Sequence, residues 1–384
     1  MDFAFTDEQL MIQESAAGFL VKASDSSAVR AAMATPTGFD PALWQQIAQE
    51  LYWPALIIPE AYGGLGLGFV EQAILLEQMG KRLLCAPFFS SACLATPALL
   101  LAPNEALRET YLPAMAAGEL RATLAFNLKR GDFASAEQAS VSAAADGYVL
   151  NGHFNAVIDG ASADLLIVCA RFADQRVGLF AVPKDSPGLS SETLVTLDQT
   201  RRQAEVRLTE VAVSADQCLS DDASALIEKV LHIGAIALAC EQVGGAQQTL
   251  DLTLAYINER KQFNRTIASF QAIKHRCADL MLFIENARSA VYYAACVAHE
   301  ALSTDGDALL AGELSEASAI AKSEASETFM HCAGESIQLH GGVGFTWEYD
   351  PHLYFKRARA SEQMLGSPSV HRERLACLLL ENRP

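Results

Sequence analysis

The sequence has little positive charge: 28 Lys and Arg residues stand against 46 Asp and Glu residues, for a formal net charge of −18. A protein this acidic repels phosphate backbones and anionic headgroups, so nucleic-acid binding and nonspecific membrane attachment are disfavoured. Any anionic ligand needs a local basic pocket. The composition is 51% hydrophobic and 19% charged, which is typical of a globular chain with large buried cores.

The chain also lacks recognisable targeting and membrane-spanning segments. Its first residues are acidic and amphipathic, unlike the basic and apolar parts of a secretory signal or the Arg-rich pattern of a transit peptide. The most apolar stretch near the middle, residues 231–240, has about half of the roughly 20 residues that a membrane span needs. We therefore expect a cytoplasmic protein without membrane insertion.

Paired cysteines are lacking as well. The nine cysteines are an odd number, are scattered along the chain and include no CxxC pair. This pattern disfavours both a disulfide framework and a zinc site. We expect reduced, mostly buried thiols and no metal.

The spacing of apolar residues divides the 384 residues into three regions. Residues 1–117 have helical spacing, and Thr6 with Gln9 forms a candidate capping box before the first helix. Residues 118–222 contain segments rich in β-branched and aromatic residues, which predict a compact, largely antiparallel β domain. Helical spacing returns over residues 223–384, in long segments that are typical of an antiparallel bundle.

The pattern therefore predicts an α+β multidomain protein with an N-terminal helical domain, a middle antiparallel β domain and a C-terminal four-helix bundle. The expected strands are GYVLNGHFNAVI, DLLIVCARF, VGLFAVP and EVRLTEVAV. The expected helices cover residues 41–51, 70–79, 223–260, 267–302, 305–338 and 351–380.

Glycines at positions 63, 64, 66 and 68 lie between two expected helices and superficially resemble a nucleotide-binding loop. Their spacing is not GxGxxG, and no βαβ unit surrounds them. A tight loop between helices is the favoured interpretation.

Two segments are rich in basic residues although the chain as a whole is acidic. Residues 256–276 and 353–374 together hold ten of the 28 Lys and Arg residues. Such a density suits phosphate groups, because guanidinium groups offer planar, multidentate contacts. It also fits solvated helix faces with intrahelical ion pairs, and the charge pattern alone favours this second interpretation.

Three segments resemble the acyl-CoA dehydrogenase family: WPALIIPEAYGGLGLG (53–68), NERKQFNRTIASFQAIKHRCADL (258–280) and ESIQLHGGVGFTWEYDPHLYFKRA (335–358). The order helical, β, helical bundle resembles the family almost from end to end. The resemblance implies FAD, an acyl-CoA thioester substrate and an electron-transfer flavoprotein as electron acceptor. It also implies a homo- or hetero-tetramer in which each flavin site draws on neighbouring subunits, and it favours phosphate binding by the basic segments.

The resemblance assigns cofactor contacts to two of these segments. Arg260, Gln262 and Phe263 match the family's element that contacts the FAD of a neighbouring subunit. Phe270 and Gln271 match the continuation of this element.

The second cofactor segment is rich in glycine. Gln338, Gly341 and Gly342 match the family's loop at the FAD pyrophosphate and adenosine, where missing side chains let the backbone approach phosphate. Asn264 stands where family members usually have Gly. If that position needs a positive φ, Asn is the least costly replacement.

The family's catalytic base is missing at both expected positions. Members usually hold this carboxylate just before a Gly that matches Gly366, and the corresponding residue is Leu365. A minority place it on the first long bundle helix, thirty residues inclusive before the Phe of RKQF, and the corresponding residue is Gly234. Neither residue can take a proton.

Glu241 and Glu362 are weak candidates for a substitute base. Glu241 lies about 10 Å beyond Gly234 along a helix axis, at about 1.5 Å per residue, and Glu362 lies one turn before Leu365. A base must come within about 3 Å of the proton that it removes. A charged group near a helix end and an ion pair with Arg359 are therefore the favoured interpretations of these two residues.

The β region departs from the family pattern too. Where typical members have a Trp-x-Thr that covers the flavin, the segment HFNAVIDG has Ala156 and Ile158. The usual Thr-Glu-Pro loop and the following Gly-Ser-Asp have become FNLKRGD at 126–132. The chain thus lacks a stacking surface and a hydroxyl donor expected for its own isoalloxazine, whereas the contacts to a partner's FAD are better preserved.

These features predict an FAD-dependent acyl-CoA dehydrogenase that makes a 2,3-enoyl-CoA, as one subunit of an α2β2 complex. Family members that act on bulky steroid side-chain thioesters include such assemblies, in which one chain type lacks the base. Two alternatives stay open: a non-catalytic FAD-binding or structural partner subunit, and an acyl-CoA oxidase or flavin monooxygenase on the same fold. Gly234 and Leu365 are compatible with a large apolar acyl group.

Overall fold

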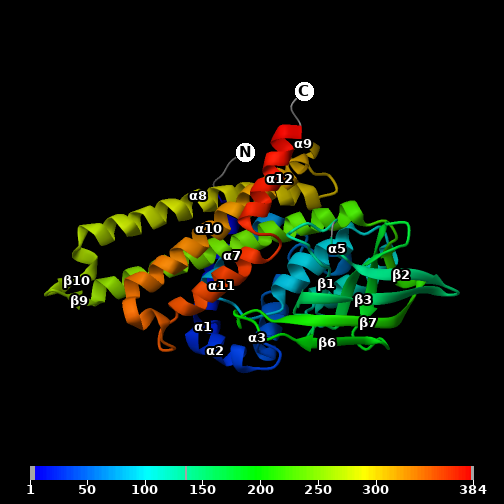
Figure 1. The fold of residues 1–384 in the computed structure, drawn as a ribbon, viewed down its shortest axis with the longest axis horizontal. Helices are drawn as coiled ribbons and strands as arrows, with labels where there is room; N and C mark the ends of the chain where they lie inside the picture. The colour runs from blue at the N-terminus through cyan, green and yellow to red at the C-terminus, as the bar shows by residue number, and fades with distance from the viewer. Residues whose placement is uncertain (1–4, 135, 382–384) are drawn as a thin grey trace.

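The computed structural model describes residues 5–134 and 136–381. It confirms the α+β class, because helices form both ends of the chain and one large sheet comes between them in sequence. In Figure 1 the long helices of the bundle extend to the left and the sheet lies to the right. The division at residues 117 and 222 stays a prediction, and residues 1–4 and 382–384 of its outer regions lie outside the described residues.

The first region is helical, as predicted. Its helices are α1 (Asp7–Ala23), α2 (Ser26–Ala34), α3 (Pro41–Gln45), α4 (Phe69–Lys81), α5 (Thr96–Leu101) and α6 (Glu105–Ala116). The capping box is confirmed: Thr6 Oγ1 accepts from the Gln9 amide at 3.2 Å, and Gln9 Oε1 accepts from the Thr6 amide at 3.1 Å. The helix expected over 41–51 begins as α3 and continues as a wider π turn, Gln46–Glu50.

The glycine-rich segment before α4 is a tight loop, in agreement with the interpretation from its spacing. The amides of Leu65, Gly66 and Leu67 donate to carbonyls within residues 55–58 and are therefore not free to bind phosphate. A Cβ on Gly64 would lie 1.9 Å from the Ile58 carbonyl oxygen, so this close approach requires glycine.

The middle region forms one eight-stranded sheet in the order β6-β7-β3-β2-β4-β5-β8, with β1 paired to β4. Its strands are β1 (Ala122–Ala125), β2 (Ala139–Ala144), β3 (Gly147–Ile158), β4 (Leu165–Arg171), β5 (Val177–Pro183), β6 (Leu189–Thr193), β7 (Gln203–Ser214) and β8 (Cys218–Ser220). The four predicted strands correspond to β3, β4, β5 and β7. The sheet is largely antiparallel, but β4 pairs in parallel with β1 and with β2.

An irregularity in β3 shapes the surface that faces the bundle. The pairing of β3 with β7 shifts register between Phe154 and Val157. Phe154 is buried, whereas Asn155 and Ala156 are both exposed instead of alternating. The side chains of two successive residues, Asn155 and Ala156, are therefore exposed on β3.

The last region is a bundle of helices. They are α7 (Ser224–Glu259), α8 (Gln271–Leu302), α9 (Ala308–Gly312), α10 (Leu314–His340), α11 (Pro351–Gln363) and α12 (Pro368–Glu381), and a two-stranded hairpin of β9 (Lys261–Gln262) and β10 (Arg265–Thr266) joins α7 to α8. α7 is buried on nearly all sides in its middle, which is why its apolar residues show no single stripe. No helix among the described residues is long and apolar enough to cross a bilayer.

The single helix expected over 351–380 is wrong. The chain leaves α11 after Gln363 and enters α12 at Pro368. In between, Leu365 and Gly366 have φ of 58° and 103°, which are left-handed values that no α-helix contains.

Candidate functional site

The two positions where the base is missing meet at one point in space. A Cβ on Gly234 would lie 3.4 Å from Leu365 Cδ1 and 2.6 Å from Leu94 Cδ2. α7 and the turn after α11 therefore converge on the same spot, and apolar side chains fill it. Because Leu94 occupies the space beside Gly234, the glycine opens no room for a larger acyl group, contrary to the expectation from its size.

Two buried side chains hold the turn that carries Leu365. Lys322 on α10 is fully buried, and its Nζ lies 2.7 Å from Ser326 Oγ and 3.1–3.3 Å from the carbonyl oxygens of Ser361, Glu362 and Gly366. These carbonyls belong to the last turn of α11 and the segment beyond it, where a cation compensates unpaired acceptors. His371 Nε2 lies 3.0 Å from the Leu365 carbonyl oxygen. The turn is thus fixed although it carries no carboxylate.

A cavity of about 490 Å³ lies between the sheet and α11, and Leu365 forms part of its wall. It is lined by Leu124, Phe126, Asn127, Leu128, Asn155, Ala156, Ile158, Thr196, Leu197, Asp198, Arg201, Gln203, Ala360, Gln363, Met364 and Leu365. Ala156 and Ile158, the two residues that replace the family's flavin cover, both belong to this wall. The structure therefore brings the missing base and the missing flavin cover together around one cavity.

Asn127, in the loop that replaces the family's flavin-binding loop, has no free donor for a cofactor. Its Nδ2 donates to the carbonyls of Glu137 and His153, both at 2.8 Å, and its Oδ1 accepts from the Asn155 amide at 3.4 Å. The side-chain amide is therefore used to hold its own loop against β3. It cannot supply the hydroxyl contact that the family pattern provides.

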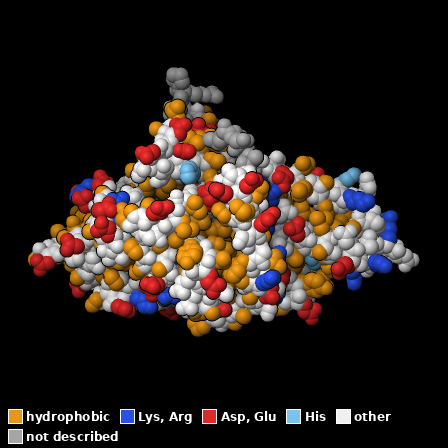
Figure 2. Space-filling view, turned by 180° about the vertical axis from the view of Figure 1, so that it is seen from behind, with side chains coloured by type: hydrophobic (Ala, Val, Ile, Leu, Met, Phe, Trp, Pro, Cys, Tyr) orange, Lys and Arg blue, Asp and Glu red, His pale blue; other side chains and the backbone are white. Residues whose placement is uncertain are grey.

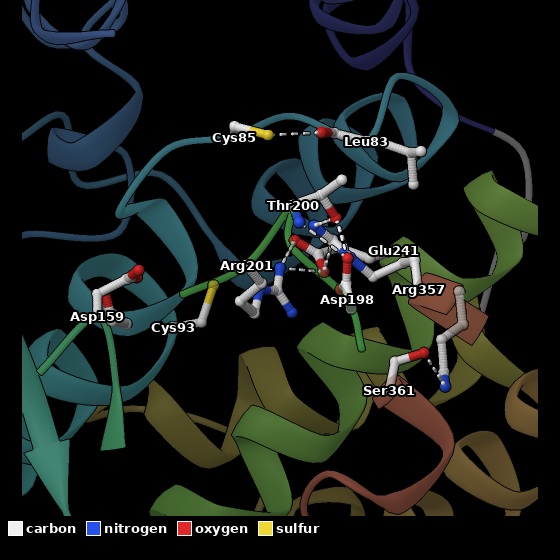
Figure 3. Close-up of polar contacts among 12 residues, drawn as sticks. Leu83, Cys85, Cys93, Asp159, Asp198, Thr200, Arg201, Glu241, Arg357 and Ser361 are labelled. Atoms are coloured by element: carbon white, nitrogen blue, oxygen red, sulfur yellow. Dashed lines mark hydrogen bonds and ion pairs between the residues drawn. The ribbon is translucent and has the colours of Figure 1, made fainter. Parts of the chain in front are cut away.

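Beside the cavity lies a buried cluster of two cations and two anions, shown in Figure 3. Arg201 Nη2 donates to both carboxylate oxygens of Glu241, at 2.5 and 2.8 Å. Arg357 Nε donates to Asp198 at 2.7 Å and to Thr200 Oγ1 at 3.0 Å. Burial alone would lower the pKa of Arg357, but Asp198 and Glu241 outweigh it and raise the pKa.

Both substitute-base candidates are held by arginines. Glu241 is paired with Arg201 and lies 3.8 Å from Arg357 Nη1, so its carboxylate belongs to the buried cluster. Glu362 is paired with Arg359, as its surface interpretation predicted. Neither Glu241 nor Glu362 lines the cavity.

The residues predicted to bind a partner's FAD lie elsewhere, at the end of the bundle that carries β9 and β10. In the hairpin turn Phe263 and Asn264 have φ of 53° and 62°, so Asn264 does adopt the positive φ for which it is suited. Arg265 stacks over the Phe270 ring, with its Cζ 3.8 Å from the ring centroid. Arg260, Gln262, Phe263, Gln271, Gln338, Gly341 and Gly342 are exposed, and Phe270 is half-buried.

The glycine segment lies beside this hairpin. Near the ends of α7 and α10, the Tyr256 ring stacks on His340 with centroids 4.4 Å apart, which brings the RKQF and QLHGG segments to one end of the molecule. Gly341 has φ 65° and ψ −142°, a conformation that favours glycine. A Cβ on Gly341 or Gly342 would meet no atom within 4 Å, so the backbone here borders open space that a phosphate-bearing ligand can approach.

The two basic segments differ in the structure. Most basic residues of 353–374 are engaged by the chain's own carboxylates: Arg357 in the buried cluster, Arg359 with Glu362 and Arg372 with Glu327. In the hairpin segment, Arg260, Lys261 and Lys274 form no ion pair with a described residue. Figure 2 shows basic side chains gathered at this end of the molecule, which lies to the right in that view.

Sequence reasoning missed the buried cluster and the contacts of Lys322 and His371 that hold the turn at Leu365. Asp198, Thr200 and Arg201 lie in a loop before β7, and their partners Glu241 and Arg357 are far along the chain. Lys322 lies within an otherwise small-residue face of α10, where a lone charge among alanines and serines was the available signal.

The chain thus combines a helical bundle that follows a β domain with an open glycine segment at one end and a cavity between bundle and sheet. Two family models identify the class of protein: the acyl-CoA dehydrogenase N-terminal domain matches residues 6–119, and the acyl-CoA dehydrogenase C-terminal domain matches residues 224–380. The chain belongs to the acyl-CoA dehydrogenase family of oxidoreductases.

Individual relatives cover nearly the whole chain. The acyl-CoA dehydrogenase IpdE2 of Mycolicibacterium smegmatis is 32% identical over 370 residues, which are 96% of this chain and 98% of that protein. A solved structure of a variant of the Tcur3481-Tcur3483 steroid ACAD is 30% identical, with a TM-score of 0.85 over 98% of both chains. The ChsE4-ChsE5 complex from Mycobacterium tuberculosis, at 24% identity, shares the fold with a TM-score of 0.89 over 100% of both chains.

Gly234 and Leu365 lie side by side, but only position 365 borders the cavity. A carboxylate introduced at the two positions should therefore lower the free energy of unfolding by different amounts. Gly234→Glu should lower the free energy of unfolding by about 3 kcal/mol or more, because the side chain collides with Leu94 and buries a charge. Leu365→Glu should cost less, because position 365 borders the cavity. Urea unfolding of the full chain measures both, with Leu94→Ala in the Gly234→Glu background as a control that should recover stability. Equal costs would contradict this geometry.

The burial of Lys322 predicts that the free energy of unfolding depends on pH. Burial lowers the pKa of Lys322 from its ordinary 10.5 to about 7, so the folded chain loses this proton near pH 7 while the unfolded chain keeps it until near pH 10.5. The unfolded state binds more protons in this window, so the contribution of Lys322 to the free energy of unfolding increases as pH rises through it.

The variant Lys322→Met lacks this titration. Between pH 7 and pH 9, the free energy of unfolding of the wild type should increase relative to that of the variant by about 2 kcal/mol. Urea titrations at the two pH values measure the shift. A pH-independent difference would show that Lys322 does not titrate as described.

Proposed function

We propose that this chain is the base-lacking, FAD-binding subunit of a heteromeric acyl-CoA dehydrogenase. Together with a second subunit that carries the carboxylate, it converts an acyl-CoA to a 2,3-enoyl-CoA. The observation that carries the proposal is the point where Gly234 and Leu365 meet, because both family positions for the base converge there and both are apolar.

The chemistry explains why this absence matters. The reaction begins with removal of a proton from the carbon next to the thioester carbonyl, and the base must come within about 3 Å of that proton. Glu241 and Glu362, the acids nearest in sequence, are paired with arginines and lie outside the cavity wall. A chain built in this way needs a partner to supply the base.

The described residues fit FAD in one of two places. At the hairpin end, Arg260, Gln262 and Gln338 with the open backbone of Gly341 and Gly342 are suited to the phosphates and adenosine of a partner's FAD. At the chain's own cavity, Ala156, Ile158 and the fully engaged Asn127 offer neither an aromatic cover nor a hydroxyl donor. FAD supplies a hydride acceptor where it is bound, and we place it in the partner's site, completed by this hairpin.

The relatives support a heteromer acting on a bulky, steroid-derived acyl-CoA. The solved structure of the Tcur3481-Tcur3483 steroid ACAD bears the names of two chains, and this chain is 30% identical to it over 98% of both. We propose an α2β2 assembly, an electron-transfer flavoprotein as electron acceptor and a cytoplasmic location. A dehydrogenase that works without a second chain type is the nearest alternative, and anaerobic treatment of the chain purified alone with acyl-CoAs distinguishes the two, because only that alternative predicts bleaching of a flavin bound by this chain.

Flavin stoichiometry tests the assembly. We expect the full chain, co-expressed with an acyl-CoA dehydrogenase chain that carries the base, to form a mixed tetramer with half a flavin per chain. Native mass spectrometry and flavin absorbance measure both quantities. If the chain alone bound one FAD per subunit and reduced it with an acyl-CoA, the proposal would fail, and oxygen consumption with peroxide formation would instead identify an oxidase.

A variant pair tests the location of the flavin contacts. Arg260→Ala should weaken FAD binding by the complex by roughly tenfold or more, because a charge-assisted phosphate contact is lost. Arg207→Ala, which removes an exposed arginine on the sheet, should leave FAD affinity unchanged. If the two variants changed FAD affinity equally, the proposal that FAD binds at the hairpin would be contradicted.

A further inference from the structure

His371, near the start of α12, holds the turn between α11 and α12. Its side chain is 1% exposed, and its Nε2 lies 3.0 Å from the Leu365 carbonyl oxygen. A carbonyl oxygen only accepts hydrogen bonds, so this contact places the ring proton on Nε2. The other ring nitrogen, Nδ1, is then unprotonated, and it is buried without a hydrogen-bond partner among the described residues. The site therefore suits a neutral imidazole, because a second proton on Nδ1 would meet no acceptor from those residues.

The turn leaves this ring little room to move. Leu365 and Gly366 have successive left-handed φ values of 58° and 103°, the first of which is costly for a leucine. A Cβ on Gly366 would lie 2.9 Å from His371 Nε2. A Cβ on Gly131, in the loop before β2, would lie 2.6 Å from Val370 Cγ1 and 3.2 Å from Gly366 Cα. The turn, the start of α12 and this loop are packed closely, so His371 cannot leave its place unless the turn opens.

The charged and titratable groups that surround His371 come from each element packed against the turn. They are Glu362 on α11, Lys322 on α10, Glu228 and His232 on α7, Asp132 in the loop before β2 and Arg374 on α12. His232 and Arg374 border a cavity of about 30 Å³ together with His371. Lys322 Nζ lies 3.3 Å from the Gly366 carbonyl oxygen. Three basic side chains thus lie around one buried imidazole.

These surroundings oppose a charge on His371. Burial, then Lys322 and Arg374, hold the pKa of His371 at about 3, well below its ordinary 6.5. Burial and Arg374 likewise lower the pKa of His232 from 6.5 to about 4. An exposed His371 would recover its ordinary pKa, so below pH 6.5 an open turn binds a proton that the closed turn excludes. Opening is therefore favoured as pH falls from 6.5 toward 3.

We propose that the turn at residues 364–367 is a pH-sensitive switch, which opens when His371 takes up a proton and frees α12 from α10. The proton comes from the solvent and adds to Nδ1, no covalent bond breaks, and loss of the proton restores the contact with the Leu365 carbonyl. The positions of Leu365 and α12 then depend on pH. The inference does not rest on the proposed function, because the groups that carry it all lie on this chain.

The contacts of α12 suit such a movement. The helix projects beyond the bundle in Figure 1, and no side chain between residues 372 and 380 is buried. The ion pair of Arg372 with Glu327 on α10 is exposed, and exposed ion pairs stabilise little. Pro368 and His371 at the start of the helix are its buried residues over 368–380. A helix with so few buried contacts opens at a lower free-energy cost than the rest of a fold.

Hydrogen exchange of the full chain at pH 6.5 and pH 5.0 tests the switch. After correction for the intrinsic exchange rate at each pH, the protection of amides in residues 364–375 should fall by about tenfold or more, because an open turn binds the proton of His371. These amides should also be less protected than those of β4 at both pH values, which distinguishes opening of the turn from global unfolding. A pH-independent protection, or one equal to that of β4, would overturn the inference.

A matched pair of variants assigns the effect to His371. His371→Gln keeps an N–H donor for the Leu365 carbonyl but does not titrate, so the fall in protection should be about tenfold smaller than in the wild type. His331→Gln makes the same change at an exposed histidine of α10, whose ring packs against Phe283, and should keep the wild-type pH dependence. Equal pH dependence in the wild type and His371→Gln would show that another group drives opening. If His371→Gln failed to fold, His371→Asn, which also offers an N–H donor, takes its place.

Discussion

The buried cluster of Arg201, Glu241, Arg357 and Asp198 is the interaction on which the arrangement of the site depends. Asp198 and Arg201 come from the loop before β7, Glu241 from the middle of α7 and Arg357 from α11, so the cluster joins the sheet to the bundle. Removing one member of a buried ion pair typically costs about 3–5 kcal/mol, because its partner is left charged and desolvated. The walls of the cavity therefore hold their positions through electrostatics as well as through packing.

Much of the fold could be predicted from the period of apolar residues. β3, β4, β5 and β7 were recognisable because each is long and rich in β-branched or aromatic residues. β1, β2, β6 and β8 have few such residues, and they depend on pairing with stronger neighbours. The break after α11 is marked in the sequence by Gly366, Ser367 and Pro368, and it was missed because the helical spacing of apolar residues on both sides was given more weight.

The candidate site, like the fold, could be predicted from the sequence only in part. The hairpin and glycine segments could be proposed as cofactor contacts from the sequence because each is contiguous and has a backbone conformation that selects its residues, as at Asn264 and Gly341. The absence of a carboxylate at two positions could be read from the sequence, but their convergence could not, since α7 and the turn are brought together only by packing. The pairing of Arg201 with Glu241 joins residues 40 positions apart, so no local pattern contains it.

The exposed aromatic side chains near the β9–β10 hairpin affect how an unassembled copy of the chain is handled in the cell. Phe263, Phe345 and Trp347 are 87, 71 and 59% exposed. Large aromatic surfaces of this kind are what chaperones and proteases recognise on unassembled proteins. A copy synthesised without its oligomeric partner would carry this signal, whereas an assembled copy would hide it. In the proposed heteromer, protein quality control would then keep the abundance of this chain in step with that of its partner subunit.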